Sequence, residues 1–480
     1  MSKKLLGILG LFVVFSMVLA ACGPTPAPEK VTVVVTQEVE KQVEVTREVE
    51  VPAASNVVHI VARCKASPPF ENGRCDNLVA AVGAANAALA EKGDDRRIEL
   101  ESIQDDADWG DYKTEFELAS EAGEAPDIVC SGHEHIGDWA TAGYLVDLTD
   151  MIGSGDYPEF DDVIESLWNA TILGGAVWGV PQDAEARPMY YSKILLKELG
   201  WSDEDIEALP ETVASGDFTW QDMFDVAQEA VEAGIVEEGD GWWHRPSNGP
   251  DFLYYYYGAG GQVQEEGFNG LVFDTEAWQR VYELLYDATQ VRHILRPNKL
   301  DGDWDFHKDY TSMFDKVVFV FEGTWRWASW HTNYLQDVGG EDYLFENAGF
   351  APIPANEEGT GKPTTLTHPL VYMISSQSEN PDLALLLISK ATVKELNTTY
   401  AVASGHLGIL ESQLDYPPYT TAKFLSATLP LLQYTTFLPN SPYWSAYSEA
   451  YYQGIQAVES GDLTPEEAVD FVVDRLQNEL

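Results

Sequence analysis

The sequence has few positive charges for its length. In 480 residues, Lys and Arg together number 28 against 79 Asp and Glu, which gives a formal net charge of −51. Such an acidic chain repels phosphate backbones and anionic lipid surfaces, so nucleic acid is excluded as an expected partner. The acidic residues are spread along the chain rather than gathered in one tail, and most of them are expected on solvated surface.

Cysteine is scarce as well, with four residues at Cys22, Cys64, Cys75 and Cys130. Their spacing does not resemble a zinc site. In an oxidising compartment Cys64 and Cys75 could close a small loop, which would stabilise the fold by about 2–3 kcal/mol. Two free thiols are the alternative. Cys130 has no evident partner and is expected to pack as a small apolar side chain.

Familiar catalytic motifs are missing, including G-x-S-x-G, S-x-x-K and H-E-x-x-H. The run His133-Glu134-His135 lacks a third metal ligand, and Asp301, Asp303 and Asp305 lack EF-hand spacing, although an adventitious Ca²⁺ site there stays open. We therefore expect no cofactor, no resident metal and no catalytic residue. Because paired carboxylates cannot be singled out among so many acids, an exported carbohydrate-active hydrolase remains an alternative.

Long apolar runs are confined to the start of the chain. Two lysines precede an apolar stretch over residues 5–20, which predicts a secretory signal peptide over residues 1–21. Leu19-Ala20-Ala21-Cys22 resembles a bacterial lipobox, which makes Cys22 the expected lipidation site; ordinary cleavage is the alternative. We expect an exported lipoprotein at the outer face of the cytoplasmic membrane.

Residues 22–55 are expected to form a lipid-anchored flexible spacer. Residues 23–30 are rich in proline, and residues 31–51 alternate valine with Thr, Gln and Glu. Period-two alternation is typical of a strand, but no partner sheet is evident. An extended spacer is therefore favoured, with a self-associating strand as the alternative.

From about residue 57 the chain becomes globular, and its remaining 424 residues are too many for one core. Strand-like and helix-like segments alternate, which predicts an α/β fold in two lobes, each a mostly parallel sheet flanked by helices. The expected strands cover 57–61, 98–103, 127–130, 177–180, 317–321 and 372–375. The expected helices cover 78–92, 109–122, 194–199, 220–233, 275–291, 382–391 and 465–480.

Aromatic residues make up 12% of the chain and occur in clusters. Aromatic faces beside carboxylates suit pyranose rings, whose C–H faces are apolar and whose hydroxyls form hydrogen bonds. The clusters supply Tyr254, Trp325, Trp444 and Tyr447 as candidate ligand contacts. For any one of these residues, packing in the core is the alternative.

Several short motifs follow one another in the order typical of a known family. They are Gly123-Glu124-Ala125-Pro126-Asp127-Ile128-Val129, Gly143-Tyr144-Leu145, Trp178-Gly179-Val180-Pro181, Phe218-Thr219-Trp220, Glu322-Gly323-Thr324-Trp325, Ala351-Pro352-Ile353-Pro354 and Ser460-Gly461-Asp462-Leu463-Thr464-Pro465. Together they resemble the family 1 extracellular solute-binding proteins, which are similar to maltose-binding protein, over essentially residues 56–480.

The resemblance implies a venus-flytrap receptor without enzymatic activity, which captures a sugar or related polar solute and delivers it to ABC permease subunits. Lobe one would comprise residues 56–183 and 355–407, and lobe two residues 184–354 and 408–480. The chain would cross between them near residues 183–185, 352–354 and 406–409. The protein is expected to be a monomer. A receptor that feeds a signalling partner instead of a permease is an alternative.

The resemblance also implies ligand contacts from Lys65, Glu134, His135, Glu185 and Trp325. Two departures put maltodextrin itself in doubt: Ser131 stands where the family has a tryptophan, and Trp444 and Tyr447 match its final aromatic pair only approximately. Arg187, Arg326 and His368 lie near the expected cleft and leave a receptor for an acidic or phosphorylated solute as an alternative.

Overall fold

The computed structural model describes residues 30–34, 46–50, 56–264, 270–296, 314–357 and 361–479. The chain separates into two compact units, residues 1–59 with 82–99, and residues 60–81 with 100–480. The expected signal peptide, the lipidation site Cys22 and the candidate Ca²⁺ site at residues 301–305 lie outside the described residues.

The first unit contains a two-stranded ribbon where we expected an extended spacer. β1 (Lys30–Val34) pairs antiparallel with β2 (Thr46–Glu50). The partner strand comes from the same segment, because two stretches with the same valine alternation can pair with each other. Elsewhere in this unit, the Asn86 amide bonds the backbone N and O of Ile98 at 2.7 and 3.0 Å.

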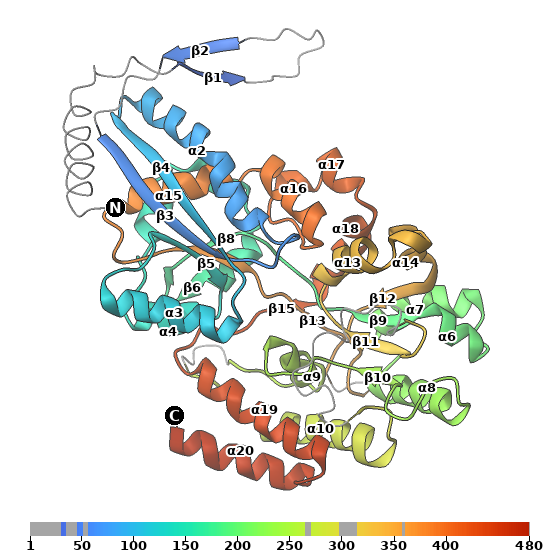
Figure 1. Ribbon diagram of the computed structural model, residues 1–480. Coiled ribbons are helices and arrows are strands. Elements are labelled where there is room, and N and C mark those ends of the chain that lie inside the picture. Colours follow the sequence, from blue (N-terminus) through green and yellow to red (C-terminus); the bar gives the residue numbers. More distant parts are fainter. Residues whose placement is uncertain are drawn as a thin grey trace, which may run out of the picture. The chain divides into compact units, whose positions relative to one another are not determined.

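A five-stranded sheet has the order β4-β3-β5-β14-β8, and Figure 1 labels β3, β4, β5 and β8 of it. Its strands are β3 (Asn56–Lys65), β4 (Arg96–Asp105), β5 (Ile128–Gly132), β8 (Val180–Pro181) and β14 (Leu370–Ile374). β5 and β14 are buried along their whole length, as expected of apolar runs in a sheet covered on both faces.

A second sheet has the order β10-β11-β9-β12. It is built from β9 (Met189–Ser192), β10 (Trp242–Trp243), β11 (Phe319–Phe321) and β12 (Ala348–Ala351). Two short ribbons pair β6 (Ile172–Leu173) with β7 (Ala176–Val177), and β13 (Thr365–Leu366) with β15 (Thr435–Thr436).

The expectation of mostly parallel sheets is wrong for much of the pairing. β3 runs parallel to β5, and β10 to β11, but β14 is antiparallel to β5 and β8, and β9 is antiparallel to β11 and β12. A βαβ crossover fixes direction only for the two strands that it joins. β14 and β9 pair with strands far away in the sequence, so the local alternation of strand-like and helix-like segments could not predict their direction. The α/β fold class itself is confirmed.

Helices flank these sheets, and side-chain caps mark the starts of α6, α7, α8 and α10. The helices are α2 (Gly73–Lys92), α3 (Trp109–Ala122), α4 (His135–Thr141), α5 (Thr149–Ile152), α6 (Lys193–Glu198), α7 (Asp203–Ser215), α8 (Trp220–Glu232), α9 (Leu253–Gly258), α10 (Thr275–Tyr286), α13 (Trp325–Ser329), α14 (Glu341–Asn347), α15 (Pro381–Ala391), α16 (Lys394–Ser404), α17 (Pro417–Thr420), α18 (Lys423–Thr428), α19 (Trp444–Ser460) and α20 (Pro465–Glu479). Thr219 and Asp222 form a capping box at α8, and Gly461, at φ 77°, ends α19 so that α20 can lie beside it (Figure 1). Of the helices in the described ranges, none combines the length and apolar character that a membrane crossing requires.

Three chain segments meet where the first sheet connects to the second. Residues 182–188 lead from β8 to β9. Within them Ala184 exchanges backbone hydrogen bonds with Leu407, at N–O distances of 3.2 and 2.6 Å, and Arg187 N donates to Thr365 Oγ1 at 2.8 Å. Ile353, near the crossing expected at residues 352–354, pairs instead with Thr364.

Candidate ligand-binding site

An acid–histidine pair, with its histidine buried and its acid partly buried, forms where β5 and β14 come together. Gly132 at the end of β5 lies opposite Leu370 at the start of β14, so the residues just beyond these two ends become neighbours. His368 Nε2 donates a hydrogen bond to Glu134 Oε2, and His368 Nδ1 lies 3.6 Å from Glu185 Oε1. Two carboxylates thus flank one imidazole.

The row of charges continues from Glu185 toward the second sheet. Glu185 Oε1 lies 2.5 Å from Arg187 NH1, close but without hydrogen-bond alignment. Arg187 Nε donates to Asp251 Oδ1 at 2.9 Å, and Arg245 pairs with the other oxygen of Asp251. Segments that are far apart in sequence therefore share one continuous electrostatic network.

A second polar cluster adjoins the first. Arg74 Nε and NH2 each lie 3.2 Å from Asp183 Oδ2, and the Tyr400 hydroxyl donates to the same oxygen at 2.7 Å. His406 Nε2 lies 3.9 Å from Asp183 Oδ2 and 3.8 Å from Glu185 Oε2. His406 thereby links the two clusters.

Two tryptophans border these clusters. The indole of Trp325 stacks on His406 with ring centroids 5.8 Å apart, and the Arg187 guanidinium lies 4.9 Å from the Trp325 ring. Trp109 is 43% exposed, and Lys65 Nζ lies 5.3 Å from its ring. Cations near aromatic faces are held by the ring quadrupole, which orients both partners.

Burial divides the histidines into charged and neutral ones. Burial opposes the charge of His368, but Glu134 and Glu185 overcome it and raise its pKa to about 9. Burial lowers the pKa of His133 and of His135 to about 4, so both rings are neutral at pH 7. Burial also opposes the charge of Glu134, yet the adjacent histidines, His368 above all, hold its pKa well below the usual range.

Two buried histidine nitrogens of this region, His133 Nε2 and His406 Nδ1, lack a hydrogen-bond partner among the described residues. Glu185 Oε1 and Arg187 NH1 are misaligned for a hydrogen bond, but they lie 2.5 Å apart and form an ion pair with each other. Leaving a buried donor or acceptor unsatisfied costs about 1–3 kcal/mol, so such atoms are rarely left without a role. A polar ligand with several hydroxyl groups would supply the missing partners.

The structure brings together most of the polar residues expected to bind ligand. Glu134, Glu185, Arg187 and His368 belong to one network, and Trp325 contacts it. Lys65, whose pKa burial lowers, reaches Trp109, and the edge of Trp109 faces His368 at 6.4 Å. Arg326 Nε lies 3.2 Å from Glu322 Oε2.

Other expected contacts lie elsewhere. Tyr254, Trp444 and Tyr447 belong to the main hydrophobic core cluster, where the Tyr447 hydroxyl donates to Val272 O at 2.9 Å. His135 is buried, with Nδ1 2.7 Å from Ser131 Oγ, but its Nε2 lies 3.6 Å from Glu134 Oε1 and so adjoins the network. These placements agree with the core-packing alternative for the aromatic clusters.

The two histidines of the His133-Glu134-His135 run do not point to a common site where they could bind a metal ion. His133 Nδ1 lies 3.1 Å from Asn440 Oδ1, whereas His135 bonds Ser131. Over the ranges that the structure describes, no group of three or more His, Cys, Asp and Glu side chains is arranged to hold a metal ion.

Several members of the network were not expected from the sequence. Arg74, Asp251 and Arg245 are buried or nearly so and each pairs with a charged partner. Asp251 and Arg245 come from a turn-rich stretch with no hydrophobic periodicity, so only the three-dimensional pairing reveals them. Trp109 was expected only as the first residue of a helix, and nothing in the local sequence indicated that it would lie beside the binding site.

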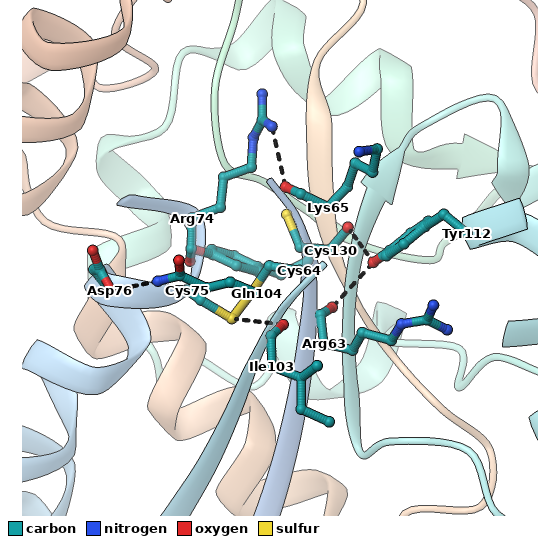
Figure 2. Close-up of a disulfide and its surroundings, with 11 residues drawn as sticks. Arg63, Cys64, Lys65, Arg74, Cys75, Asp76, Ile103, Gln104, Tyr112 and Cys130 are labelled. Carbon is teal, nitrogen blue, oxygen red and sulfur yellow. Dashed lines mark hydrogen bonds between the residues drawn. A yellow bond between two sulfur atoms is a disulfide. The ribbon is translucent and has the colours of Figure 1, made fainter. Parts of the chain in front are cut away.

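A disulfide holds two of these residues close together. Cys64 and Cys75 are bridged, with Cα atoms 5.7 Å apart, as the sequence suggested (Figure 2). Their sequence neighbours are Lys65 and Arg74, and Arg74 NH1 donates to Lys65 O at 3.1 Å. Cys130 is buried and unbridged, and burial raises the pKa of its thiol.

With this geometry in view, comparison with known proteins decides the family. Residues 76–396 match the bacterial extracellular solute-binding protein family. The chain belongs to this family. Its members act outside the cytoplasm, so the location of this solute-binding protein is extracytoplasmic.

Similar proteins include sugar binders. An arabinooligosaccharide-binding protein of Halalkalibacterium halodurans is 25% identical over 248 residues, which are 50% of this chain and 48% of that protein. The chain thus spans about half the length of this relative. The GacH receptor of Streptomyces glaucescens, solved with and without acarbose, is 19% identical, with a TM-score of 0.66 over 88% of this chain and 98% of that one. Maltose-bound MalE3 of T. maritima is 18% identical, with a TM-score of 0.65 over 88% of this chain and 100% of that one. These likenesses confirm the two-lobed fold.

Proposed function

We propose that this solute-binding protein captures a sugar between two lobes and delivers it to the permease subunits of an ABC importer. The observation that carries the proposal is the buried Nδ1 of His406, which lacks a partner among the described residues, on a ring that stacks on Trp325 beside the charges of Glu185 and Arg187. A sugar matches this arrangement, since its hydroxyls give and accept hydrogen bonds while its C–H face lies on an indole. The relatives named for arabinooligosaccharide, acarbose and maltose support the same class of ligand.

The charges favour a neutral sugar over an acidic or phosphorylated one. Arg187 and Arg245 both pair with Asp251, so neither guanidinium lacks a carboxylate. The cationic His368 already lies between Glu134 and Glu185. An added anion would face these carboxylates, whereas neutral hydroxyls can bond to both signs of charge.

The lobes would be joined at the meeting of residues 182–188 with Thr365 and Leu407. Hydrogen bonds tie these segments together, as expected of a hinge region. We place the lobes as the family resemblance implies, residues 56–183 with 355–407 and residues 184–354 with 408–480, with the middle crossing nearer to Thr365 than to residues 352–354. Ligand contacts from both lobes would favour the closed state.

Outside the lobes, the proposal includes an anchor. Residues 1–21 would be removed, Cys22 would carry the lipid, and residues 22–55 would tether a monomeric receptor at the outer face of the cytoplasmic membrane. Replacing Cys22 with Ser should release the protein from the membrane fraction. Retention of Cys22→Ser in the membrane would contradict the anchor and leave the binding proposal intact.

Thermal unfolding with a sugar panel tests the proposed function. The protein is denatured and refolded to remove bound solute, then heated with monosaccharides, oligosaccharides, polyols and sugar phosphates. A ligand at 100 times its dissociation constant adds about 2.7 kcal/mol of stability. A rise in Tm with a neutral sugar, with no product released, is the expected result. A rise only with sugar phosphates, or cleavage of the sugar, would contradict it.

A further inference from the structure

A separate cavity of about 660 Å³ opens beside α9, β13 and β15, which lie together in the fold (Figure 1). Bare backbone forms part of its wall. Gly361, at φ +81°, approaches Gly258 so closely that a Cβ on Gly361 would lie 2.1 Å from the Gly258 carbonyl oxygen. Glycine is required there by both the backbone conformation and the contact, so this part of the wall carries no side chain.

The lining of the cavity has the chemistry of a carbohydrate site. Half-buried Tyr257 and Phe437 present aromatic rings, and exposed Gln262 and Gln264 present amides that both donate and accept hydrogen bonds. The described lining contains one cation, Lys362, and no carboxylate, although the chain as a whole has a net charge of −51. Its volume falls within the range of about 300–1,000 Å³ typical of small-molecule sites.

The lining of the cavity contacts the candidate ligand-binding site through Phe437. The edge of Phe437 faces His133 at 6.4 Å between ring centroids, and His133 lies 5.6 Å from His368 in the charged network. Asn440, which follows the cavity residue Pro439, bonds His133 as well. The buried Nε2 of His133, which lacks a partner among the described residues, lies at this junction.

We infer that the cavity is a second sugar subsite, which binds further units of an oligosaccharide whose first unit occupies the Glu185–Arg187–Trp325 site. The inference rests on the proposed function and adds a determinant of chain length to it. Because the cavity lies beyond His133 and Phe437, a monosaccharide in the first site would leave it unused. An oligosaccharide would contact both places.

Calorimetric titration with sugars of increasing length tests the inference. Oligomers of arabinose, glucose, xylose, galactose and mannose, from one to five units, are titrated into the refolded wild-type protein and into Phe437→Ala. In the series that binds, the affinity of the wild type should rise about tenfold or more as the oligomer lengthens. In Phe437→Ala most of that rise should disappear. The shortest oligomer that binds should keep its wild-type affinity in the variant. Gln264→Ala, a change at an exposed side chain, should reduce the same rise if Phe437→Ala does not fold.

The control is Phe345→Ala. Phe345 and Phe437 are both half-buried and pack against the same core cluster, but Phe345 does not line the cavity. It should lose stability without any change in length dependence. Wild-type affinity that does not rise with length would overturn the subsite and leave the proposed function intact. Binding of no oligomer at any length would overturn both.

Discussion

His368 and Glu134 form a largely buried ion pair, and their hydrogen bond joins the end of β5 to the start of β14. The two strands are antiparallel neighbours, so the register of their pairing brings the two charged side chains together. The pKa of His368, raised to about 9, means that the folded protein keeps a proton there that the unfolded chain releases above about pH 6.5.

The first prediction concerns pH. A pKa raised by folding contributes stability that is complete below the unfolded value and is lost as pH rises through the folded value. Between about pH 6.5 and 9 the His368 contribution should therefore decline, by at most about 1.4 kcal/mol per pH unit for one proton. Urea unfolding across this window measures the slope. His368→Gln should flatten it, and identical slopes in wild type and variant would contradict the assignment.

The second prediction moves Glu134 without removing a charge. A Cβ on Gly132 would lie 2.3 Å from Glu134 Oε2 and 2.7 Å from His368 Nε2. These are ends of side chains that can shift, so Gly132→Ala should still fold, with a lower Tm because the ion pair is disturbed, and should weaken sugar binding by about tenfold. Gly83→Ala, with no atom within 4 Å of the new Cβ, is the matched control. Unaltered affinity in Gly132→Ala would remove Glu134 from the site.

Short regular segments of the fold were predictable from the sequence. The expected helix over residues 109–122 coincides with α3, and the apolar run of β5 identified its strand, because helix periodicity and apolar runs are local signals. α9 was missed, since its Leu-Tyr-Tyr-Tyr-Tyr-Gly sequence has no alternation of apolar and polar residues.

The site was only partly predictable. Family motifs identified Glu134, Glu185 and Trp325, but the ion pair of Arg187 with Asp251 joins residues 64 positions apart. No local pattern reports such a pairing. The burial of Trp444 could not be predicted either, because an aromatic cluster has the same sequence pattern in a core as in a ligand-binding cleft.

The third prediction concerns the stacking face of Trp325. Trp325→Ala should reduce affinity by at least about 1 kcal/mol if a sugar lies on the indole. Gly323→Ala should act in the same direction, because its Cβ would lie 1.8 Å from the Trp325 ring and would displace it. The control for lost stability is Trp201→Ala, because Trp201 is also a half-buried tryptophan but packs against the main hydrophobic core cluster. Calorimetric affinities that match wild type in Trp325→Ala would exclude stacking.

The fourth prediction concerns the bridge between Cys64 and Cys75. Removing it in the double variant Cys64→Ala/Cys75→Ala should lower the free energy of unfolding by about 2–3 kcal/mol. Because Lys65 and Arg74 are its sequence neighbours, sugar affinity should fall too. Reducing agent should reproduce both effects in wild type and have no effect on the variant. A variant as stable as wild type would show that the bridge contributes nothing to the fold.

The fifth prediction concerns contact between the proposed lobes. Ser445 at the start of α19 donates to Asp138 of α4 at 3.1 Å and accepts from Lys113 of α3 at 3.1 Å. Next to this contact, a Cβ on Gly137 would lie 2.4 Å from the backbone oxygen of Ser441.

Backbone cannot move aside as a side-chain end can, so Gly137→Ala should separate α4 from residue 441 and disfavour the closed state. Sugar affinity should fall by about tenfold or more, with little change in the far-UV spectrum, and small-angle scattering should show a larger radius of gyration. Gly110→Ala in α3 introduces the same methyl group where no atom lies within 4 Å, and should behave as wild type. Equal radius and affinity in Gly137→Ala and Gly110→Ala would mean that the approach of residue 441 to α4 is not part of closure.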